Sequence, residues 1–223
     1  GLFQTRQLAT PNDLNQNDKN MKKFSFQERK NSLRDLEMVY LDLFIIGGGI
    51  NGAGAARDAS MRGMKVGLAE ASDFASGTSS RSSKLIHGGI RYLENMEFKL
   101  VFEALNERTR LFEMVPHLVH PLRFMIPLYK TSRVGMFKMG LGMWLYDLLA
   151  LFQVPEMHER LTGSETMQRM PSLKSPGLEG SFIYSDGYMD DDRLVHETMR
   201  SAADMGAACA NYVKAIGADF RAD

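Results

Sequence analysis

The sequence has little of several features that would place it in a specialised class. Cys209 is the only cysteine among 223 residues, so an internal disulfide is excluded and a reducing cytoplasm is favoured. Basic and acidic residues number 27 each, so the formal net charge is zero and no strong field for nucleic acid is expected. Residues 1–20 are polar and contain no apolar segment of a secretory signal.

Long uninterrupted apolar runs are also lacking. The nearest approach is residues 135–152, "GMFKMGLGMWLYDLLALF", in which Lys138 and Asp147 break the apolar pattern. Charges are costly at bilayer depth, so we do not expect a membrane span. The sequence predicts a buried or partly buried helix here, with a helix on a membrane surface or over a groove as the alternative.

The overall composition is that of a globular protein. Hydrophobic residues make up 44% and charged residues 24%, so the chain can bury a sizeable core. The first residue is Gly1, and Met21, followed by two lysines, is a plausible translation start. We therefore interpret residues 1–20 as an extension and leave them out of the fold prediction.

Hydrophobic periodicity predicts alternating helices and strands. A helix over residues 93–115 should end at Pro116, with Arg108 occupying one slot of its apolar face. Asp190, Asp191 and Asp192 should open a helix that Gly206 ends. The other expected elements are a helix in 24–38, strands at 41–46 and 65–71 around a glycine-rich turn and helix at 47–63, a largely irregular stretch over 121–180, and strands at 181–185 and 210–216.

The pattern Gly47-x-Gly49-x-x-Gly52 lies between the first strand and the following helix. Gly47 permits a tight turn, Gly49 lets the backbone approach a pyrophosphate, and Gly52 lets the helix pack closely on the sheet. The helix N-terminus offers free N–H groups and a partial positive charge to phosphates. This order of strand, glycine turn and helix indicates dinucleotide binding.

Glu70 ends the second strand, 23 residues after Gly47. A carboxylate at this place is expected to accept hydrogen bonds from the hydroxyls of an adenosine ribose. It would repel a 2′-phosphate, which argues against NADP. The alternative reading of Glu70 is a solvated acid at the end of a strand.

A second polar stretch follows at residues 78–94, "TSSRSSKLIHGGIRYLE". It is too rich in serine and glycine for a good helix and too polar for a core strand. An NAD-dependent dehydrogenase would leave this stretch without a function, whereas FAD is longer and its flavin extends beyond the pyrophosphate. Gly88 and Gly89 would let the main chain lie close to a flavin ring, and Lys84 could place a positive charge near it.

Three stretches together resemble FAD-dependent, quinone-linked glycerol-3-phosphate dehydrogenases. They are "IIGGGINGAGAARDASMRG", "DFASGTSSRSSKLIHGGIRYLE" and "PHLVHPLRFMIPLY", and the resemblance extends from Phe24 to Ile216. It implies an α/β fold: a Rossmann-like FAD-binding domain of the D-amino-acid-oxidase/glutathione-reductase type with part of a substrate (cap) domain. We expect an N-terminal extension and short helix at 1–39, the first part of the FAD domain at 40–120, a cap segment at 121–180, and a return to the FAD domain at 181–223.

The resemblance implies roles for particular residues. Arg91 and Tyr92 would face the substrate, and His87 would either act as a base or pack against the cofactor. The ADP half of FAD would be held by Gly47, Gly49, Asn51, Gly52 and Glu70, and its pyrophosphate and flavin by Thr78, Ser79, Ser82, Ser83, Lys84, Leu85, His87, Gly88 and Gly89. No metal site is expected, because prolines bracket His117-x-x-His120 and no third ligand is near.

The implied reaction oxidises glycerol 3-phosphate to dihydroxyacetone phosphate and passes the electrons through FAD to quinone. The implied location is the cytoplasm, peripheral at the inner membrane, and a homodimer is left open. Family members are roughly twice as long as this chain, so we expect an N-terminal fragment. Two alternatives remain: a glycerophosphate oxidase that uses oxygen, and a truncated FAD-binding fragment without turnover.

Overall fold

The computed structural model describes residues 24–219, which divide into two compact units. Unit 1 contains the described residues up to Ser82 and from Asp191 onward, and unit 2 contains residues Ser83–Asp190. These boundaries differ from the expected ones at 120/121 and 180/181. The reason is that each expected boundary falls inside a long strand of unit 2, either β4 (Val119–Tyr129) or β6 (Leu178–Met189). These two strands pair along their whole length, so the residues on both sides of each boundary belong to one sheet.

Unit 1 has a parallel three-stranded sheet of order β1-β2-β7. Its strands are β1 (Leu43–Ile46), β2 (Val66–Ala69) and β7 (Ala208–Ala210). The expected strand at 210–216 therefore begins and ends earlier, and the chain beyond it has no regular structure up to residue 219. Tyr212 adopts a φ of 53°, which turns the backbone out of the extended conformation soon after β7.

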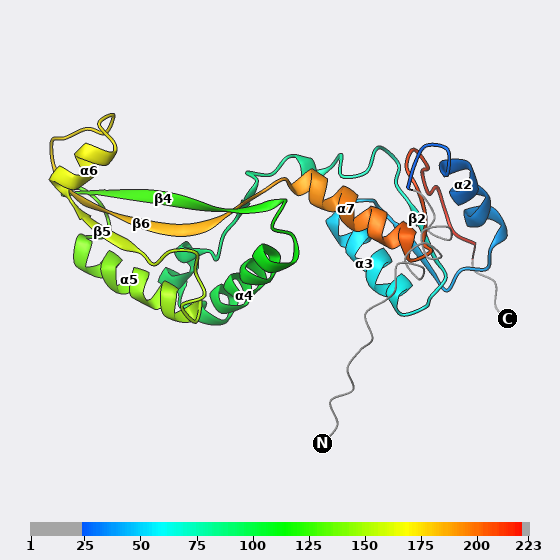
Figure 1. The fold of residues 1–223 in the computed structure, drawn as a ribbon, viewed down its shortest axis with the longest axis horizontal. Coiled ribbons are helices and arrows are strands. Elements are labelled where there is room, and N and C mark those ends of the chain that lie inside the picture. The colour runs from blue at the N-terminus through cyan, green and yellow to red at the C-terminus, as the bar shows by residue number, and fades with distance from the viewer. Residues whose placement is uncertain (1–23, 220–223) are drawn as a thin grey trace, which may run out of the picture. The chain divides into compact units, whose positions relative to one another are not determined.

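Two helices cover one face of this sheet, α3 (Ile50–Met61) and α7 (Asp191–Asp204), and they lie side by side (Figure 1). Small residues allow the close approach: Ala53 and Ala56 of α3 are fully buried, and Ala202 of α7 is too. Asp191 and Asp192 occupy the first turn of α7, and Gly206, with a φ of 104°, follows its end. The predicted start and end of this helix are confirmed.

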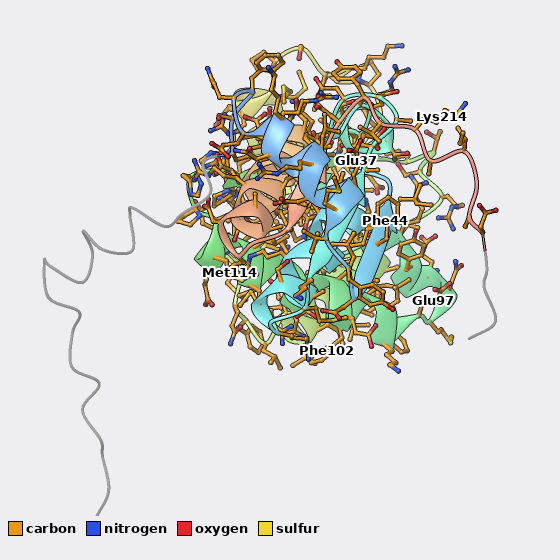
Figure 2. All side chains as sticks on the ribbon, turned by 90° about the vertical axis from the view of Figure 1, so that its right-hand side faces the viewer. Glu37, Phe44, Glu97, Phe102, Met114 and Lys214 are labelled. Atoms are coloured by element: carbon orange, nitrogen blue, oxygen red, sulfur yellow. The ribbon has the colours of Figure 1, made fainter. Side chains whose placement is uncertain are left out.

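The helix expected in 24–38 is α2 (Arg29–Met38), which packs on β7 and β2. A Cβ at Gly67 of β2 would lie 2.7 Å from the Leu36 side chain, so this glycine lets α2 approach the sheet. Phe44 and Ile46 of β1 remain 47% and 73% exposed, and Figure 2 shows Phe44 at the surface.

Unit 2 is built on an antiparallel sheet of order β3-β6-β4, with β3 at Leu85–Ile86, and β5 (Glu159–Thr162) also pairs with β6. The prediction that residues 121–180 are largely irregular is wrong. β4 contains Pro121 and Pro127, and it forms a strand at the sheet edge, where a residue without an N–H is tolerated. The expected strand at 181–185 is the centre of the longer β6.

Two helices complete the core of unit 2, α4 (Phe98–Met114) and α5 (Met136–Leu149). The expected helix 93–115 starts later, because Met96 has a φ of 61° and separates α4 from the 3-10 segment η2 (Ile90–Asn95). The buried face of α4 carries Val101, Leu105 and Arg108, one position away from most of the expected apolar face. Arg108 does occupy a core slot and is fully buried.

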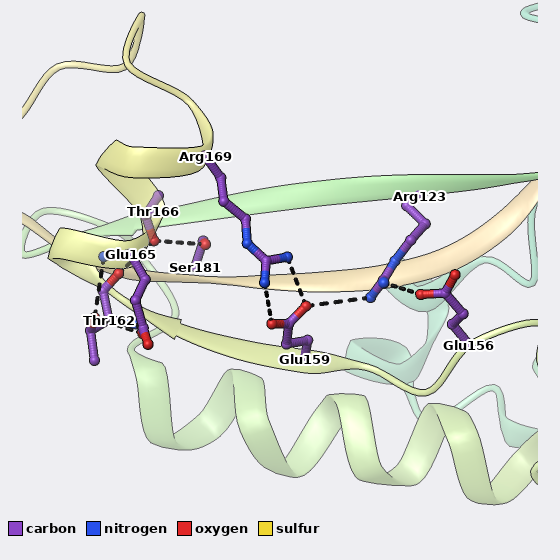
Figure 3. A network of polar contacts seen from close by, with 8 residues as sticks. All are labelled: Arg123, Glu156, Glu159, Thr162, Glu165, Thr166, Arg169 and Ser181. Carbon is purple, nitrogen blue, oxygen red and sulfur yellow. Dashed lines mark hydrogen bonds and ion pairs between the residues drawn. The ribbon is translucent and has the colours of Figure 1, made fainter.

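In the sheet of unit 2, a polar network joins β4 and β5 to the short helix that follows β5 (Figure 3). Glu159 of β5 accepts two hydrogen bonds from Arg169, at 2.8 and 2.6 Å, and lies 3.8 Å from Arg123 of β4. Arg169 belongs to α6 (Gly163–Arg169), whose N-terminus is closed by a capping box between Thr162 and Glu165. The network thus joins two strands and the short helix.

One face of α5 is apolar and exposed. We call this set of residues the α5 stripe; its members are more than half exposed and recur at helical spacing, at Phe137, Leu141, Trp144 and Leu148. The opposite face, with Met143 and Tyr146, is buried. The helix is thus partly buried, as predicted, and no helix among residues 24–219 is long and apolar enough to span a membrane.

Candidate functional site

In unit 1 the glycine turn joins β1 to α3 as the sequence predicts. Gly47 has a φ of 113° and donates its N–H to the Ala69 carbonyl at 2.9 Å. A Cβ at Gly52 would lie 1.9 Å from the Gly47 carbonyl oxygen, and one at Gly48 would lie 2.6 Å from Phe74. The turn therefore requires glycine at three positions, and Gly48 is one that the sequence pattern did not single out.

Glu70 lies against this turn. Its Oε2 accepts the N–H of Gly48 at 2.7 Å, and its Oε1 accepts the N–H of Ser72 at 2.7 Å. These contacts hold the carboxylate beside the glycine turn, at the carboxyl end of β2, where ligands of open parallel sheets bind. The alternative of a freely solvated strand-end acid does not fit this geometry.

The first part of the serine-rich stretch also belongs to unit 1. Ser79, in the 3-10 segment η1 (Thr78–Ser80), accepts the N–H of Ile50 at 3.3 Å and so lies at the N-terminus of α3. Ser82 donates to the Asp191 carboxylate at the start of α7. Thr78 is exposed, and so is Asn51 in the first turn of α3.

These residues fit the diphosphate of a dinucleotide. Gly49 precedes α3 and has no side chain with which to cap it, and in the first turn the Ile50 N–H is accepted by Ser79. The partial positive charge of the helix N-terminus favours an anion there. The Glu70 carboxylate beside the turn supplies hydrogen-bond acceptors for ribose hydroxyls.

The second part of the stretch belongs to unit 2. Lys84 has a φ of 58°, and its ammonium lies 3.2 Å from Asp190, so its charge is paired within this unit. Ser83 and His87 are exposed, whereas Gly88 and Gly89 are buried. Leu85 lies in β3, which pairs with β6.

Arg91 lines a pocket of about 530 Å³ in unit 2. Two further cations, Arg133 and Lys138, and one carboxylate, Glu94, line the same pocket. Arg133 donates to Glu94 at 2.7 and 2.5 Å, and this hydrogen bonding lowers the pKa of the Glu94 carboxyl. The pocket therefore keeps a positive balance, which suits an anionic ligand.

The other two predicted catalytic side chains do not line that pocket. Tyr92 is 41% exposed, and its ring packs against Gly89, where a Cβ would lie 2.4 Å from the ring. His87 is exposed one residue before Gly88. The roles of His87, Arg91 and Tyr92 stay predictions.

A buried polar network that sequence reasoning missed lies under the glycine pair. Asp186 of β6 accepts from Arg108 at 2.6 Å and from the Tyr146 hydroxyl at 2.7 Å. The N–H of Gly88 donates to the Tyr146 hydroxyl oxygen at 2.9 Å. The one feature of the sequence that could have indicated this network is Arg108, a charged residue on the apolar face of a predicted helix. A buried guanidinium needs a buried acid as its partner.

Burial also changes the acidity of two tyrosines. It raises the pKa of Tyr146 far above the usual range, and the Asp186 carboxylate raises it further. It raises the pKa of Tyr184, on the same strand as Asp186, to about 12. Both hydroxyls therefore remain protonated at neutral pH.

Comparisons with known proteins agree with this geometry. A family model described as FAD dependent oxidoreductase matches residues 42–223. The aerobic glycerol-3-phosphate dehydrogenases of Bacillus subtilis (strain 168) and Staphylococcus aureus (strain USA300) are 46% and 44% identical to this chain, each over 191 residues. Each match covers 86% of this chain and 34% of the relative, so the chain spans about a third of the length of these relatives.

Solved structures show the same fold. The glycerol-3-phosphate dehydrogenase of Bacillus halodurans, complexed with FAD, aligns with a TM-score of 0.66 and 32% identity, over 89% of this chain and 32% of that one. The L-α-glycerophosphate oxidase of Mycoplasma pneumoniae aligns with a TM-score of 0.56 and 17% identity, over 77% of this chain and 44% of that one. The second likeness concerns the fold alone.

Proposed function

Because this chain belongs to the family of FAD-dependent oxidoreductases, we propose that it binds FAD and takes part in the oxidation of glycerol 3-phosphate to dihydroxyacetone phosphate. The observation that carries the cofactor assignment is the contact of Glu70 with Gly48 at the N-terminal end of α3. Gly47, Gly49, Asn51 and Gly52 hold the diphosphate in this proposal, and Glu70 holds the adenosine ribose.

The substrate assignment is supported by the relatives' names and by the charges around Arg91. The B. subtilis and S. aureus relatives are named for glycerol 3-phosphate, whose phosphate monoester is a dianion. Arg91 presents a fork of donors that matches phosphate oxygens, and Lys138 adds a second positive charge in the same pocket. FAD supplies the acceptor for the hydride that leaves C2 of the substrate.

The proton of the C2 hydroxyl needs an acceptor in the same step. His87 is the proposed acceptor, because an imidazole suits general-base chemistry and His87 lies only four residues before Arg91 in the chain. Replacing His87 by Asn keeps one hydrogen-bonding group but removes the base. The rate of flavin reduction by glycerol 3-phosphate should then fall by about 10²-fold or more, while FAD binding is kept. An unchanged rate in the folded variant would assign the proton to another group.

The electron acceptor is proposed to be a quinone at a membrane surface. The α5 stripe supports this location, since an amphipathic helix with exposed Phe, Leu and Trp can lie in the interface plane of a bilayer. Vesicles with anionic headgroups imitate the cytoplasmic leaflet of such a membrane, whose surface is negatively charged. The proposed location is therefore the cytoplasm, with the protein peripheral at the inner membrane.

Membrane binding is tested with lipid vesicles. The protein should co-sediment with anionic vesicles, and Trp144→Glu should abolish this, because a charge would enter the apolar interface. Met205→Glu is the matched control, since Met205 is 53% exposed but lies in unit 1, outside the α5 stripe. Equal sedimentation of wild type and Trp144→Glu would contradict the proposal.

The function is tested with the purified, FAD-loaded protein under anaerobic conditions. Glycerol 3-phosphate should bleach the flavin absorption, and a quinone-like dye should restore it. Peroxide release in air, faster than dye reduction, would favour the glycerophosphate oxidase alternative. Bound flavin that glycerol 3-phosphate does not bleach would mark a fragment without turnover.

A further inference from the structure

The segment between β3 and η2 follows an unusual path in unit 2. Gly88 and Gly89 are buried, and Gly89 has a φ of 69°. A Cβ at Gly88 would lie 2.3 Å from Leu105 and 2.6 Å from the Tyr146 hydroxyl. The main chain of this bend is therefore pressed onto α4 and α5 with no room for a side chain.

Hydrogen bonds from the Gly88 N–H anchor the bend, and the shorter of them runs through Tyr146. The Gly88 N–H donates to the Tyr146 hydroxyl oxygen, and that hydroxyl donates to Asp186 Oδ1. The direct contact from the Gly88 N–H to Asp186 is longer, 3.4 Å against 2.9 Å to Tyr146. Tyr146 thus links the buried Asp186 carboxylate to the main chain at Gly88.

Arg108 completes this network. Its Nη1 donates to Asp186 at 2.6 Å and to the Ser185 carbonyl at 2.9 Å, and both side chains of the ion pair are at most 1% exposed. The guanidinium thus supplies the opposite charge directly beside the buried Asp186 side chain. Because the Tyr146 hydroxyl keeps its proton, the direction of each hydrogen bond is fixed.

A buried polar network of this kind adds little to the stability of a core. A buried ion pair contributes little net stability compared with well-packed apolar side chains. Within residues 24–219, Arg108 Nε and Nη2 and Ser185 Oγ also have no hydrogen-bond partner. Because the network contributes so little stability, we interpret its role as fixing the position of the main chain that it contacts.

We propose that Tyr146, held by Asp186 and Arg108, is a positioning residue that fixes the Gly88–Gly89 main chain and thereby places His87 and Arg91 for reaction. This inference rests on the proposed function for its catalytic consequence, because His87 and Arg91 belong to the proposed site. Its structural part, the anchoring of the Gly88 N–H, stands independently of any activity.

The variant that isolates the contact is Tyr146→Phe. It removes the hydroxyl but keeps the ring, which packs edge-on against Tyr184 at 5.9 Å. Tyr129→Phe is the matched control, because Tyr129 ends β4 in the same unit and lies outside the network. Hydrogen exchange of the amides in residues 85–92 is measured in both variants and in wild type.

The Gly88 amide should be protected in wild type and in Tyr129→Phe, and should exchange at least tenfold faster in Tyr146→Phe. In the FAD-loaded protein, flavin reduction by glycerol 3-phosphate, counted per bound flavin, should fall by about 10- to 100-fold in Tyr146→Phe alone. Counting per bound flavin removes the contribution of unfolded molecules, so a merely structural role would leave this rate unchanged.

Two results would overturn the inference. One is a Gly88 amide that exchanges in wild type as fast as an unstructured amide; this needs no variant and so holds even if Tyr146→Phe does not fold. The other is a Tyr146→Phe protein that loses protection but reduces flavin at the wild-type rate. If wild type itself shows no reduction by glycerol 3-phosphate, the proposed function and the catalytic role both fail, and the exchange result decides the anchoring alone.

Discussion

The substitution Gly52→Ala tests the glycine turn most sharply. The new Cβ would lie 1.9 Å from the Gly47 carbonyl oxygen, and ordinary contact begins at 3.4 Å. The turn must therefore move by about 1.5 Å, the difference between these distances, or α3 must shift away from the sheet. Both movements displace the first-turn N–H groups that are proposed to hold the FAD diphosphate.

The cost of such overpacking is typically about 1–3 kcal/mol. Since about 1.4 kcal/mol corresponds to a tenfold change in affinity, the dissociation constant for FAD should rise roughly five- to hundredfold. The assay is a titration of the apoprotein with FAD, followed by quenching of flavin fluorescence, with circular dichroism to establish that the variant is folded.

Gly54→Ala is the matched control in the same helix. Nothing lies within 4 Å of its added Cβ, and alanine favours a helix interior by about 1 kcal/mol over glycine. It should bind FAD as wild type does and melt at a slightly higher temperature. A folded Gly52→Ala protein with wild-type affinity, or an equal loss in Gly54→Ala, would refute the reasoning.

Three further outcomes are expected. The free energy of unfolding should fall as pH rises above about 10, because the unfolded chain loses tyrosine protons there while Tyr146 and Tyr184 in the folded protein keep theirs. In urea titrations at alkaline pH, the free energy of unfolding of Tyr146→Phe should decline less steeply with pH than that of wild type. An identical decline in the two proteins would contradict the burial argument. Thr162→Ala should lower stability by about 1 kcal/mol in a urea titration, because it opens the capping box of α6, and an unchanged midpoint would deny that the box stabilises the helix. Arg108→Met should cost about 3–5 kcal/mol in the same titration, because Asp186 would be left buried without its partner; a loss below 1 kcal/mol would show that the carboxylate is compensated elsewhere.

The sequence predicted unit 1 well because its signals are local. The glycine turn, the strand before it and the acid after the second strand each depend on neighbouring residues, and the structure brings Glu70 against Gly48. Asp191 at the start of α7 and Gly206 at its end are equally local signals. Ser82 shows the limit, since its contact with Asp191 joins residues 109 positions apart.

Unit 2 was predicted poorly because its structure depends on distant pairing. β4 contains Pro121 and Pro127, and it becomes a strand because β6, some 60 residues later, pairs with it. The predicted apolar face of α4 is displaced by one residue from the face that is buried, because Met96 turns the chain before the helix begins. Arg108 looked like an interruption of an apolar face, and only the position of Asp186 explains its burial.

The measurement that tests the central claim most directly is the visible absorption spectrum of the purified protein after incubation with FAD and gel filtration. We expect flavin absorption to co-elute with the protein and not to be displaced by an excess of NAD. A colourless protein that leaves FAD in the late fractions, yet is protected by NAD against heat, would contradict it.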